Sequence, residues 1–438
     1  MKQFANFILT SLIFFTTIRV TAQTHEWTLQ ECTNYAVENN ISIKQTEQSI
    51  QSQEIRLNSA QNTYLPDVSA SASQNFSFGR GLTANNTYSN TNTRTTSFSV
   101  GANMNLFNGF QRKNNIELNK LNLNAMNVDL EKVKNDVRLQ VAQAYVQILY
   151  DMEIEDVTRR QIEIDSEQVA RLVSFVINGK SSEAELSQQK ASLANSKLTY
   201  TQAVNNRKLS ILTLSQLLEL PSPDSFAIVR PDTSQLVFSN FQSSNINYEE
   251  RPEIKAEQIR LNATEYSYKV ARSGYLPTLS ISGGLSTNYY TVSNMPSESF
   301  SKQIDNNFSQ YIGINLNIPI FSRFNVRNDV RDVKIQRENQ QLSLDLARKN
   351  LYKEIQQVNL NAENALAKVI SSREAVSNSE IAFRLAKARY ENGKSTITEF
   401  NEAKNNYLKS QSDYAQTIYE FMYCKMLVKW YSGEEMAW

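Results

Sequence analysis

Two long stretches without Gly or Pro constrain the fold of this chain more than any other feature. Phe110–Asn178 and Phe324–Asn392 each run for 69 residues without either, in a chain of 438 residues with 11 Gly and 8 Pro. Gly and Pro are the residues that most often interrupt helices, so each stretch can form one helix of roughly 100 Å. Shorter stretches of the same kind follow, at 180–220 and 394–432. The sequence therefore predicts two long helical hairpins.

Both long stretches repeat an apolar residue at every seventh position. These residues are Ile116, Leu123, Leu130, Val137 and Ala144 in the first stretch, and Leu344, Leu351, Val358 and Ala365 in the second. A seven-residue spacing keeps one apolar seam facing a partner helix, which is typical of coiled coils. An ordinary amphipathic helix is the alternative, but such helices average only about 11–12 residues.

The chain is a tandem duplication. A shift of 211 residues superimposes Tyr64–Pro66 on Tyr275–Pro277, and a shift of 214 superimposes Asn178–Ser181 on Asn392–Ser395. The matched positions keep one order along nearly the whole chain. We therefore divide the sequence into a first repeat at 23–220, a linker or equatorial segment at 221–246, and a second repeat at 247–438. Each repeat is expected to contain a helix, two strands, a long helix, a tip turn and a helix.

Between the helical stretches of each repeat, the apolar period changes to two. Apolar residues alternate with Ser, Asn and Gly from Val68 to Phe78 and from Phe98 to Leu106, and again around Leu279–Leu285 and Ile312–Ile318. This pattern is typical of strands with one face in lipid and the other toward water, and it equally fits one sheet of a soluble sandwich. The joining segments at 79–95 and 290–307 are long and polar, as in the outer loops of membrane barrels.

The number of strands limits how such a sheet can lie in a membrane. We expect four strands per chain, whereas membrane barrels begin at about eight strands. A lone four-stranded sheet would leave its edge N–H and C=O groups unpaired in lipid. If the strands span a membrane, subunits must share the barrel. The predicted fold class is an α+β membrane protein, with long antiparallel coiled coils forming an α-barrel continuous with a shared transmembrane β-barrel.

The N-terminus predicts export. Residues 1–22 combine Lys2, an apolar core and the short side chains Val20–Ala22, which together are typical of a cleavable signal peptide. Cys32 and Cys424 are widely separated in the sequence. The two cysteines could form a disulfide in an exported protein. The simpler interpretation is that they are two buried thiols on separate helices.

Charge and motifs exclude several classes of function. Lys and Arg total 45 against 44 Asp and Glu, so the chain has no electrostatic signature of nucleic-acid binding. The single His, at position 25, argues against a catalytic triad and against a His-rich metal site. Motifs for phosphate, nucleotide or zinc binding are also missing from the sequence. We predict no enzymatic activity, no cofactor and no metal.

The sequence resembles the TolC family of outer-membrane efflux channels over nearly the whole mature chain. The family's N-terminal helix is resembled by Trp27–Cys32, Tyr35–Ala36 and Glu38–Asn40. Its helix-to-strand junctions are resembled by Tyr64–Pro66 and Tyr275–Pro277. Its periplasmic tip is resembled by Tyr390–Phe400, and the other copy of that tip by Phe175–Leu186. The resemblance implies a homotrimer in the outer membrane with a periplasmic helical domain. It also implies a periplasmic adaptor and an inner-membrane pump of RND, ABC or MFS type as partners. The trimer would then be a passive exit duct for efflux or type I secretion, whose cargo and pump class the sequence leaves open.

The same resemblance implies roles for residues near the tips. Tyr390, Glu399 and Glu402 match a tip tyrosine and two acidic pore residues, and Glu185 matches an acidic gate residue whose basic partner is replaced here by Ser395, beside Lys394. Adaptor contact is expected at the two turns, formed by Asn178, Gly179, Lys180 and Ser181 and by Asn392, Gly393, Lys394 and Ser395. Apart from the resemblance, all of these residues also fit solvated helix turns.

A different class of protein also fits the pattern. An exported structural or adhesive coiled-coil protein with a soluble β module would share the long helices and the alternating strands. Dependence on detergent during extraction distinguishes the two, because a soluble protein extracts without detergent.

Overall fold

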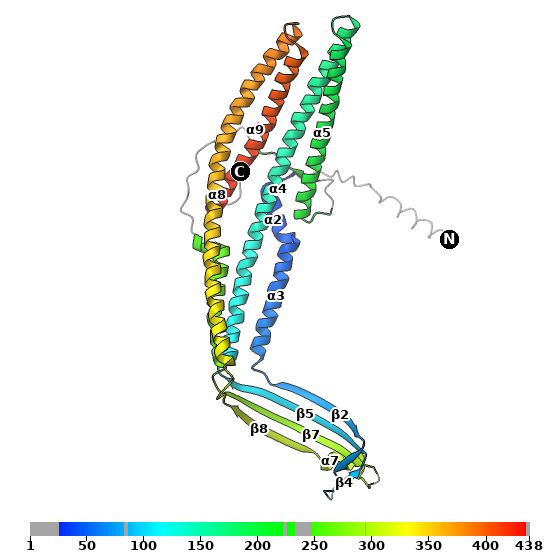
Figure 1. The fold of residues 1–438 in the computed structure, drawn as a ribbon, viewed down its shortest axis with the longest axis vertical. Helices are drawn as coiled ribbons and strands as arrows, with labels where there is room; N and C mark the ends of the chain where they lie inside the picture. Colours follow the sequence, from blue (N-terminus) through cyan, green and yellow to red (C-terminus); the bar gives the residue numbers. More distant parts are fainter. Residues whose placement is uncertain (1–25, 83–85, 222–225, 233–247, 294, 435–438) are drawn as a thin grey trace, which may run out of the picture. The chain divides into compact units, whose positions relative to one another are not determined.

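The structure is a computed structural model that describes residues 26–434, except for 83–85, 222–225, 233–247 and 294 (Figure 1). The predicted signal peptide and most of the predicted linker lie outside the described residues. The chain forms two compact units, and each unit takes segments from both halves of the sequence. One contains Met1–Ile41, Asn135–Ile246 and Ile355–Trp438, and the other contains Ser42–Lys134 and Asn247–Glu354.

The two predicted long helices are confirmed. Helices α4 (Gln111–Ile177) and α8 (Asn325–Glu391) have 67 residues each. Helices α5 (Glu183–Leu217) and α9 (Ile397–Tyr431) have 35 residues each. Figure 1 shows α5 running back beside α4 and α9 running back beside α8. Among the helices of the described chain, none is both long and apolar enough to cross a membrane.

The predicted seven-residue seam is confirmed in α8 and only partly in α4. Leu344, Leu351, Val358 and Ala365 are all buried. Of the α4 series, Val137 is buried and the other four residues are half-buried. The buried stripe of α4 continues instead through Val141, Tyr145, Ile148 and Leu149. The Tyr145 hydroxyl lies 3.1 Å from the Trp27 carbonyl oxygen and 2.7 Å from that of Val229, so α4 packs here against short strands as well as helices.

The helix expected at the start of the first repeat is interrupted. Helix α2 (Leu29–Asn39) begins with a capping box at Thr28, and α3 (Ile41–Asn62) follows after Asn40. Asn40 has an extended backbone (φ −59°, ψ 132°), and its side-chain amide donates to the Leu217 carbonyl oxygen at 3.1 Å. This bond satisfies a carbonyl that the end of α5 leaves without a helical partner. The contact joins distant parts of the sequence, so local sequence patterns do not reveal the break.

The second unit contains a four-stranded antiparallel sheet. Strands β2 (Asp67–Ser77), β5 (Thr93–Asn108), β7 (Thr278–Val292) and β8 (Ser309–Asn317) lie in the order β2-β5-β7-β8. The registers Ala70–Val100, Val100–Leu285 and Ile281–Ile314 place the apolar residues of neighbouring strands on one face. The other face carries Ser and Asn, including the Ser71–Ser99 and Ser286–Ser309 hydroxyl pairs at 2.8 Å. The predicted alternation is therefore confirmed across the whole sheet.

Several short elements were not expected. Strands β1 (Glu26–Trp27) and β6 (Ala227–Ile228) form a parallel pair, and β3 (Arg80–Leu82) and β4 (Tyr88–Asn90) form a small antiparallel pair. Helix α7 (Phe300–Asn306) lies within the second predicted loop, and the short helix η2 (Tyr248–Glu250) precedes α6 (Pro252–Ser273). The prediction of only four strands is thus wrong for the chain, although it holds for the large sheet. Strands of two or three residues are too short to show an alternating pattern.

The main elements follow the order helix, strand, strand, helix, helix twice, with the short elements β3, β4 and α7 inserted between the strands. Equivalent side-chain contacts recur as well. Phe107 and Phe110 form an edge-to-face pair with ring centroids 5.1 Å apart, and Phe321 and Phe324 form the same pair at 5.4 Å. Both pairs lie where a strand segment passes into a long helix.

The two cysteines do not form a disulfide in the structure. Cys32 on α2 and Cys424 on α9 are both buried free thiols, which contradicts the pairing hypothesis and agrees with the simpler interpretation. Cys32 interacts electrostatically with Glu31 and Tyr145, whereas Cys424 interacts with Glu420 and Lys368. Burial raises the pKa of Cys32 to about 12 and that of Cys424 to about 11. Both thiols therefore stay protonated and unreactive at neutral pH.

Candidate functional site at the helical tips

The two turns that join the long and short helices have the same geometry. Gly179 and Gly393 adopt φ values of +68° and +69°. The Lys180 N–H donates to the Phe175 carbonyl oxygen at 2.8 Å, and the Lys394 N–H donates to that of Arg389, also at 2.8 Å. These bonds close a Schellman motif, in which a residue with positive φ ends the helix.

Capping contacts complete both turns. The Ser182 and Thr396 hydroxyls each accept the backbone N–H of the third residue of the next helix, at 3.2 Å. The Asn178 side-chain amide donates to the Ser174 carbonyl oxygen at 2.7 Å, and the Asn392 amide makes the same bond to Ala388. Both turns are mostly exposed, and a Cβ atom at either glycine would meet no other atom. The eight predicted tip residues therefore form two exposed, structurally equivalent turns.

An apolar cluster joins the α4–α5 hairpin to the α8–α9 hairpin behind the turns. Its buried members are Leu172, Leu186, Ile397 and Phe400, and Tyr390 packs against them. The Tyr390 ring stacks on Phe400 with centroids 5.4 Å apart. Because residues of both halves of the chain meet here, the cluster fixes one hairpin against the other.

Two ion pairs link α4 directly to α8 beside this cluster. An Arg171 guanidinium nitrogen lies 2.9 Å from a carboxylate oxygen of Glu391, and the Lys387 ammonium lies 3.5 Å from the Glu167 carboxylate. Their side chains are partly exposed, so each pair contributes little stability, about 0–1 kcal/mol. The pairs chiefly define which faces of α4 and α8 meet within one chain.

Tyr390 and Glu185, two of the predicted gate residues, lie near each other. Burial raises the pKa of Tyr390, the negative charge of Glu185 raises it further, and a hydrogen bond with Gln168 opposes this rise. The phenol therefore stays neutral at physiological pH. Glu185 also accepts a hydrogen bond from the Ser181 hydroxyl of its own turn.

The other predicted gate residues have different surroundings. Glu399 and Glu402 are exposed on α9, whereas Phe400 between them is buried. Ser395 is half-buried, and its hydroxyl has no hydrogen-bond partner in the described structure. The structure therefore brings Glu185 and Tyr390 together and leaves the two remaining carboxylates open to solvent.

A buried polar network, which our sequence analysis did not identify, lies deeper between the hairpins. Asp165 on α4 and Lys404 on α9 are fully buried and form an ion pair. The Asp165 carboxylate also accepts the Gln189 amide at 2.9 Å and the Ser196 hydroxyl at 2.5 Å. The Lys404 ammonium lies 3.3 Å from the Ser192 hydroxyl oxygen. Buried charges need such partners, because taking an ion out of water without compensation is costly.

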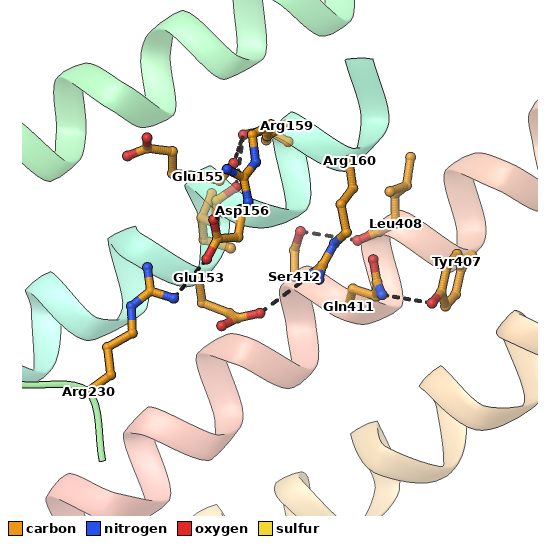
Figure 2. A network of polar contacts seen from close by, with 12 residues as sticks. Glu153, Glu155, Asp156, Arg159, Arg160, Arg230, Tyr407, Leu408, Gln411 and Ser412 are labelled. Atoms are coloured by element: carbon orange, nitrogen blue, oxygen red, sulfur yellow. Dashed lines mark hydrogen bonds and ion pairs between the residues drawn. The ribbon is translucent and has the colours of Figure 1, made fainter. Parts of the chain in front are cut away.

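Closer to the middle of α4, a second and more exposed network includes Arg230 from the segment that follows β6 (Figure 2). Arg230 reaches Asp156 at 2.7 Å, and Arg159 contacts the same carboxylate at 3.0 Å. Arg160 lies 3.6 Å from Glu153, also on α4. The Arg230–Asp156 pair attaches the described part of the equatorial segment to α4, whereas the other two pairs lie within α4. Among the described residues, no group of three or more His, Cys, Asp or Glu side chains is arranged to hold a metal ion.

The chain matches the family described as outer membrane efflux protein over residues 33–219 and 246–420. The outer membrane efflux protein BepC of Brucella suis biovar 1 (strain 1330) is 22% identical over 382 residues, which cover 86% of this chain and 78% of that protein. A membrane protein from Pseudomonas aeruginosa has the same fold with a TM-score of 0.77, at 17% identity and 92% coverage of both chains. The CmeC outer membrane channel of Campylobacter jejuni has a TM-score of 0.76 at 18% identity, and the match covers 94% of this chain and 87% of that chain.

These matches confirm the resemblance to outer-membrane efflux channels that the duplicated pattern indicated. BepC and CmeC are described as an efflux protein and a channel, which supports the expected non-enzymatic role. The structural matches share the fold, including its long helices and its sheet. The family match covers well over half of the sequence, so this chain belongs to the outer membrane efflux protein family.

Proposed function

We propose that this protein is the trimeric outer-membrane exit duct of a tripartite efflux or type I secretion system. In this role it conducts cargo passively and is coupled through a periplasmic adaptor to an inner-membrane pump. Family membership favours this function over that of an exported adhesive coiled-coil protein. The long helices would lie in the periplasm and the four-stranded sheet in the outer membrane.

The four-stranded sheet is the observation that carries the proposal. One face presents exposed apolar side chains, among them Val68, Val100, Leu285 and Ile314. Within the part of the chain that the structure describes, strands β2 and β8 each pair on one side only, so both edges of the sheet are open there. In lipid, each unpaired N–H or C=O group costs several kcal/mol. Pairing β2 of one copy with β8 of the next removes both edges, and three copies close the ring in the proposed trimer.

The purified protein is expected to be a trimer that requires detergent. Because the apolar face and the open edges need lipid and neighbouring copies, extraction without detergent should fail. Membrane fractionation followed by mass measurement in detergent tests this expectation. A monodisperse monomer with intact β-structure, or a protein that extracts without detergent, would contradict the proposed function.

Cargo delivery in this proposal depends on the two exposed turns. The adaptor would contact Asn178–Ser181 and Asn392–Ser395, because these turns are mostly exposed and lie at the ends of both hairpins. Tyr390 and Glu185 lie just behind them, and Glu399 and Glu402 lie on the first two turns of α9. In the trimer, each of these residues would recur around the axis and form part of the periplasmic gate.

Replacing Glu399 and Glu402 together by Gln is expected to reduce cation selectivity. Rings of carboxylates in a narrow pore create a negative potential that attracts cations and repels anions. Conductance and reversal potential in planar bilayers measure the change, and block by divalent cations from the periplasmic side should weaken as well. The matched control is Glu183→Gln, because Glu183 is an exposed carboxylate of the other hairpin. Selectivity equal to that of the unmodified channel would place both carboxylates outside the pore.

A further inference from the structure

The two halves of the chain carry opposite chemistry at equivalent positions near the tips. The turns superimpose with a shift of 214 residues. With this shift, Arg171 corresponds to Leu385, and its ion-pair partner Glu391 corresponds to Ile177. This charged contact between α4 and α8 within the chain therefore has apolar residues at the equivalent positions of the two helices.

The second ion pair follows the same rule. Glu167 corresponds to Ile381, and Lys387 corresponds to Val173. Two independent ion pairs are thus matched by two sets of large apolar residues. The hydrogen-bonded Gln168 and Tyr390 are likewise matched by Ala382 and Val176.

The four apolar counterparts are all exposed in a single chain. Ile177 is 79% exposed, Leu385 58%, Ile381 45% and Val173 37%. Large aliphatic side chains on a helix normally face a core, so four of them exposed on two equivalent helix faces indicate a missing partner. The same two helices already bury their other faces against each other.

The faces on each helix have a defined angle between them. On α8, Ile381 and Leu385 precede Lys387 and Glu391 by six positions, which places the two faces about 120° apart around the helix axis. The same spacing separates Glu167 and Arg171 from Val173 and Ile177 on α4. If each helix contacts one neighbour through each of its two faces, faces about 120° apart generate a ring of six helices, since 120° is the interior angle of a hexagon. In such a ring α4 and α8 would alternate, and three chains would supply the helices.

We propose that a second copy of this chain covers these residues, with Val173 and Ile177 of its α4 packed against Ile381 and Leu385 of α8. This inference rests on the proposed trimer and adds the position and chemistry of its tip contact. The contact between copies repeats the contact within a copy, with aliphatic side chains in place of ion pairs. Salt screens partly exposed ion pairs and affects apolar contacts far less, so the contact between copies keeps its strength at high ionic strength.

Site-specific cross-linking tests the position of this contact. In a Cys32→Ala, Cys424→Ala background, Ile177→Cys is combined with Leu385→Cys, and the protein in membranes is treated with a short bis-maleimide. Denaturing gels should show covalent dimers and trimers as the main products. Arg171→Cys with Glu391→Cys is the matched control, and it should yield monomers linked internally.

Each result of this experiment has one meaning. Monomers alone from the Ile177 and Leu385 pair, in a protein that is trimeric by mass in detergent, would overturn this contact and leave the proposed trimer intact. A monomer by mass would instead overturn the trimer. Covalent dimers and trimers that require both cysteines would establish the contact.

A charge exchange tests the chemistry of the contact. Ile177→Glu alone should raise the open fraction in bilayer recordings on the order of tenfold, because a carboxylate enters an apolar contact without a partner. Adding Leu385→Arg recreates the ion pair found within the chain. It should restore closure at low salt and make closure weaken as salt rises. Equal open fractions in the unmodified channel, the single variant and the double variant would show that these residues do not meet.

Discussion

Replacing Lys404 by Ala should destabilise the helical tips by about 3–5 kcal/mol, because it leaves the buried Asp165 carboxylate without its cation. The ion pair is fully buried, and the Gln189 and Ser196 side chains are already bonded to the same carboxylate. Hydrogen exchange of the α4 and α9 amides near the tip should accelerate about a hundredfold or more. The melting temperature of the purified protein should also fall.

The duplication supplies the matched control for this substitution. Lys190 corresponds to Lys404 in the other half and is exposed, so Lys190→Ala should change stability little. Combining Asp165→Asn with Lys404→Met removes both charges and keeps hydrogen-bonding groups for Gln189 and Ser196. This pair should recover most of the lost stability. Equal stability of the Lys404→Ala and Lys190→Ala variants would show that the buried pair is energetically unimportant.

Replacing both Gly179 and Gly393 by Val should abolish export and leave trimer assembly intact. Both glycines adopt positive φ values, which β-branched residues reach only with strain of about 1–3 kcal/mol each. The turns would change conformation at the surface proposed to meet the adaptor, far along the sequence from the strands. Dye accumulation in cells that depend on this channel measures export, and mass in detergent measures assembly.

Asn is the control residue at these positions, because it tolerates positive φ better than other residues with a side chain. Gly179→Asn with Gly393→Asn should therefore export nearly normally. Normal export by the Val double variant, with the protein trimeric, would contradict adaptor docking at the turns. Failure of the Val variant to assemble would show that the turns act on folding instead.

Local patterns in the sequence predicted most of the architecture. The two stretches without Gly or Pro became α4 and α8, and the glycines that follow them, Gly179 and Gly393, became their turns. The alternating segments became the four main strands, with apolar and polar faces as expected. These features depend on residues close together in the sequence. The apolar periodicity and the positions of Gly and Pro therefore reveal them.

Contacts between distant residues decided the rest. Asn40 interrupts the first helix because its side chain bonds to Leu217, and β1 pairs with β6 across most of the first repeat. The predicted tip residues were easy to locate because glycine marks both turns. No local sequence pattern identifies the buried network behind them, because its members come from three different helices, α4, α5 and α9.

The two equivalent lysines show where sequence information ends. Lys190 and Lys404 occupy the same place in the duplicated pattern, on helices of equal length that follow equivalent turns. The sequence by itself determined those helices and turns, because they follow from local spacing. Only the tertiary structure decided that Lys404 is buried and Lys190 exposed, because Asp165 packs against Lys404 within the chain. A buried ammonium is stable only where packing brings a carboxylate to it, and no local pattern encodes that meeting.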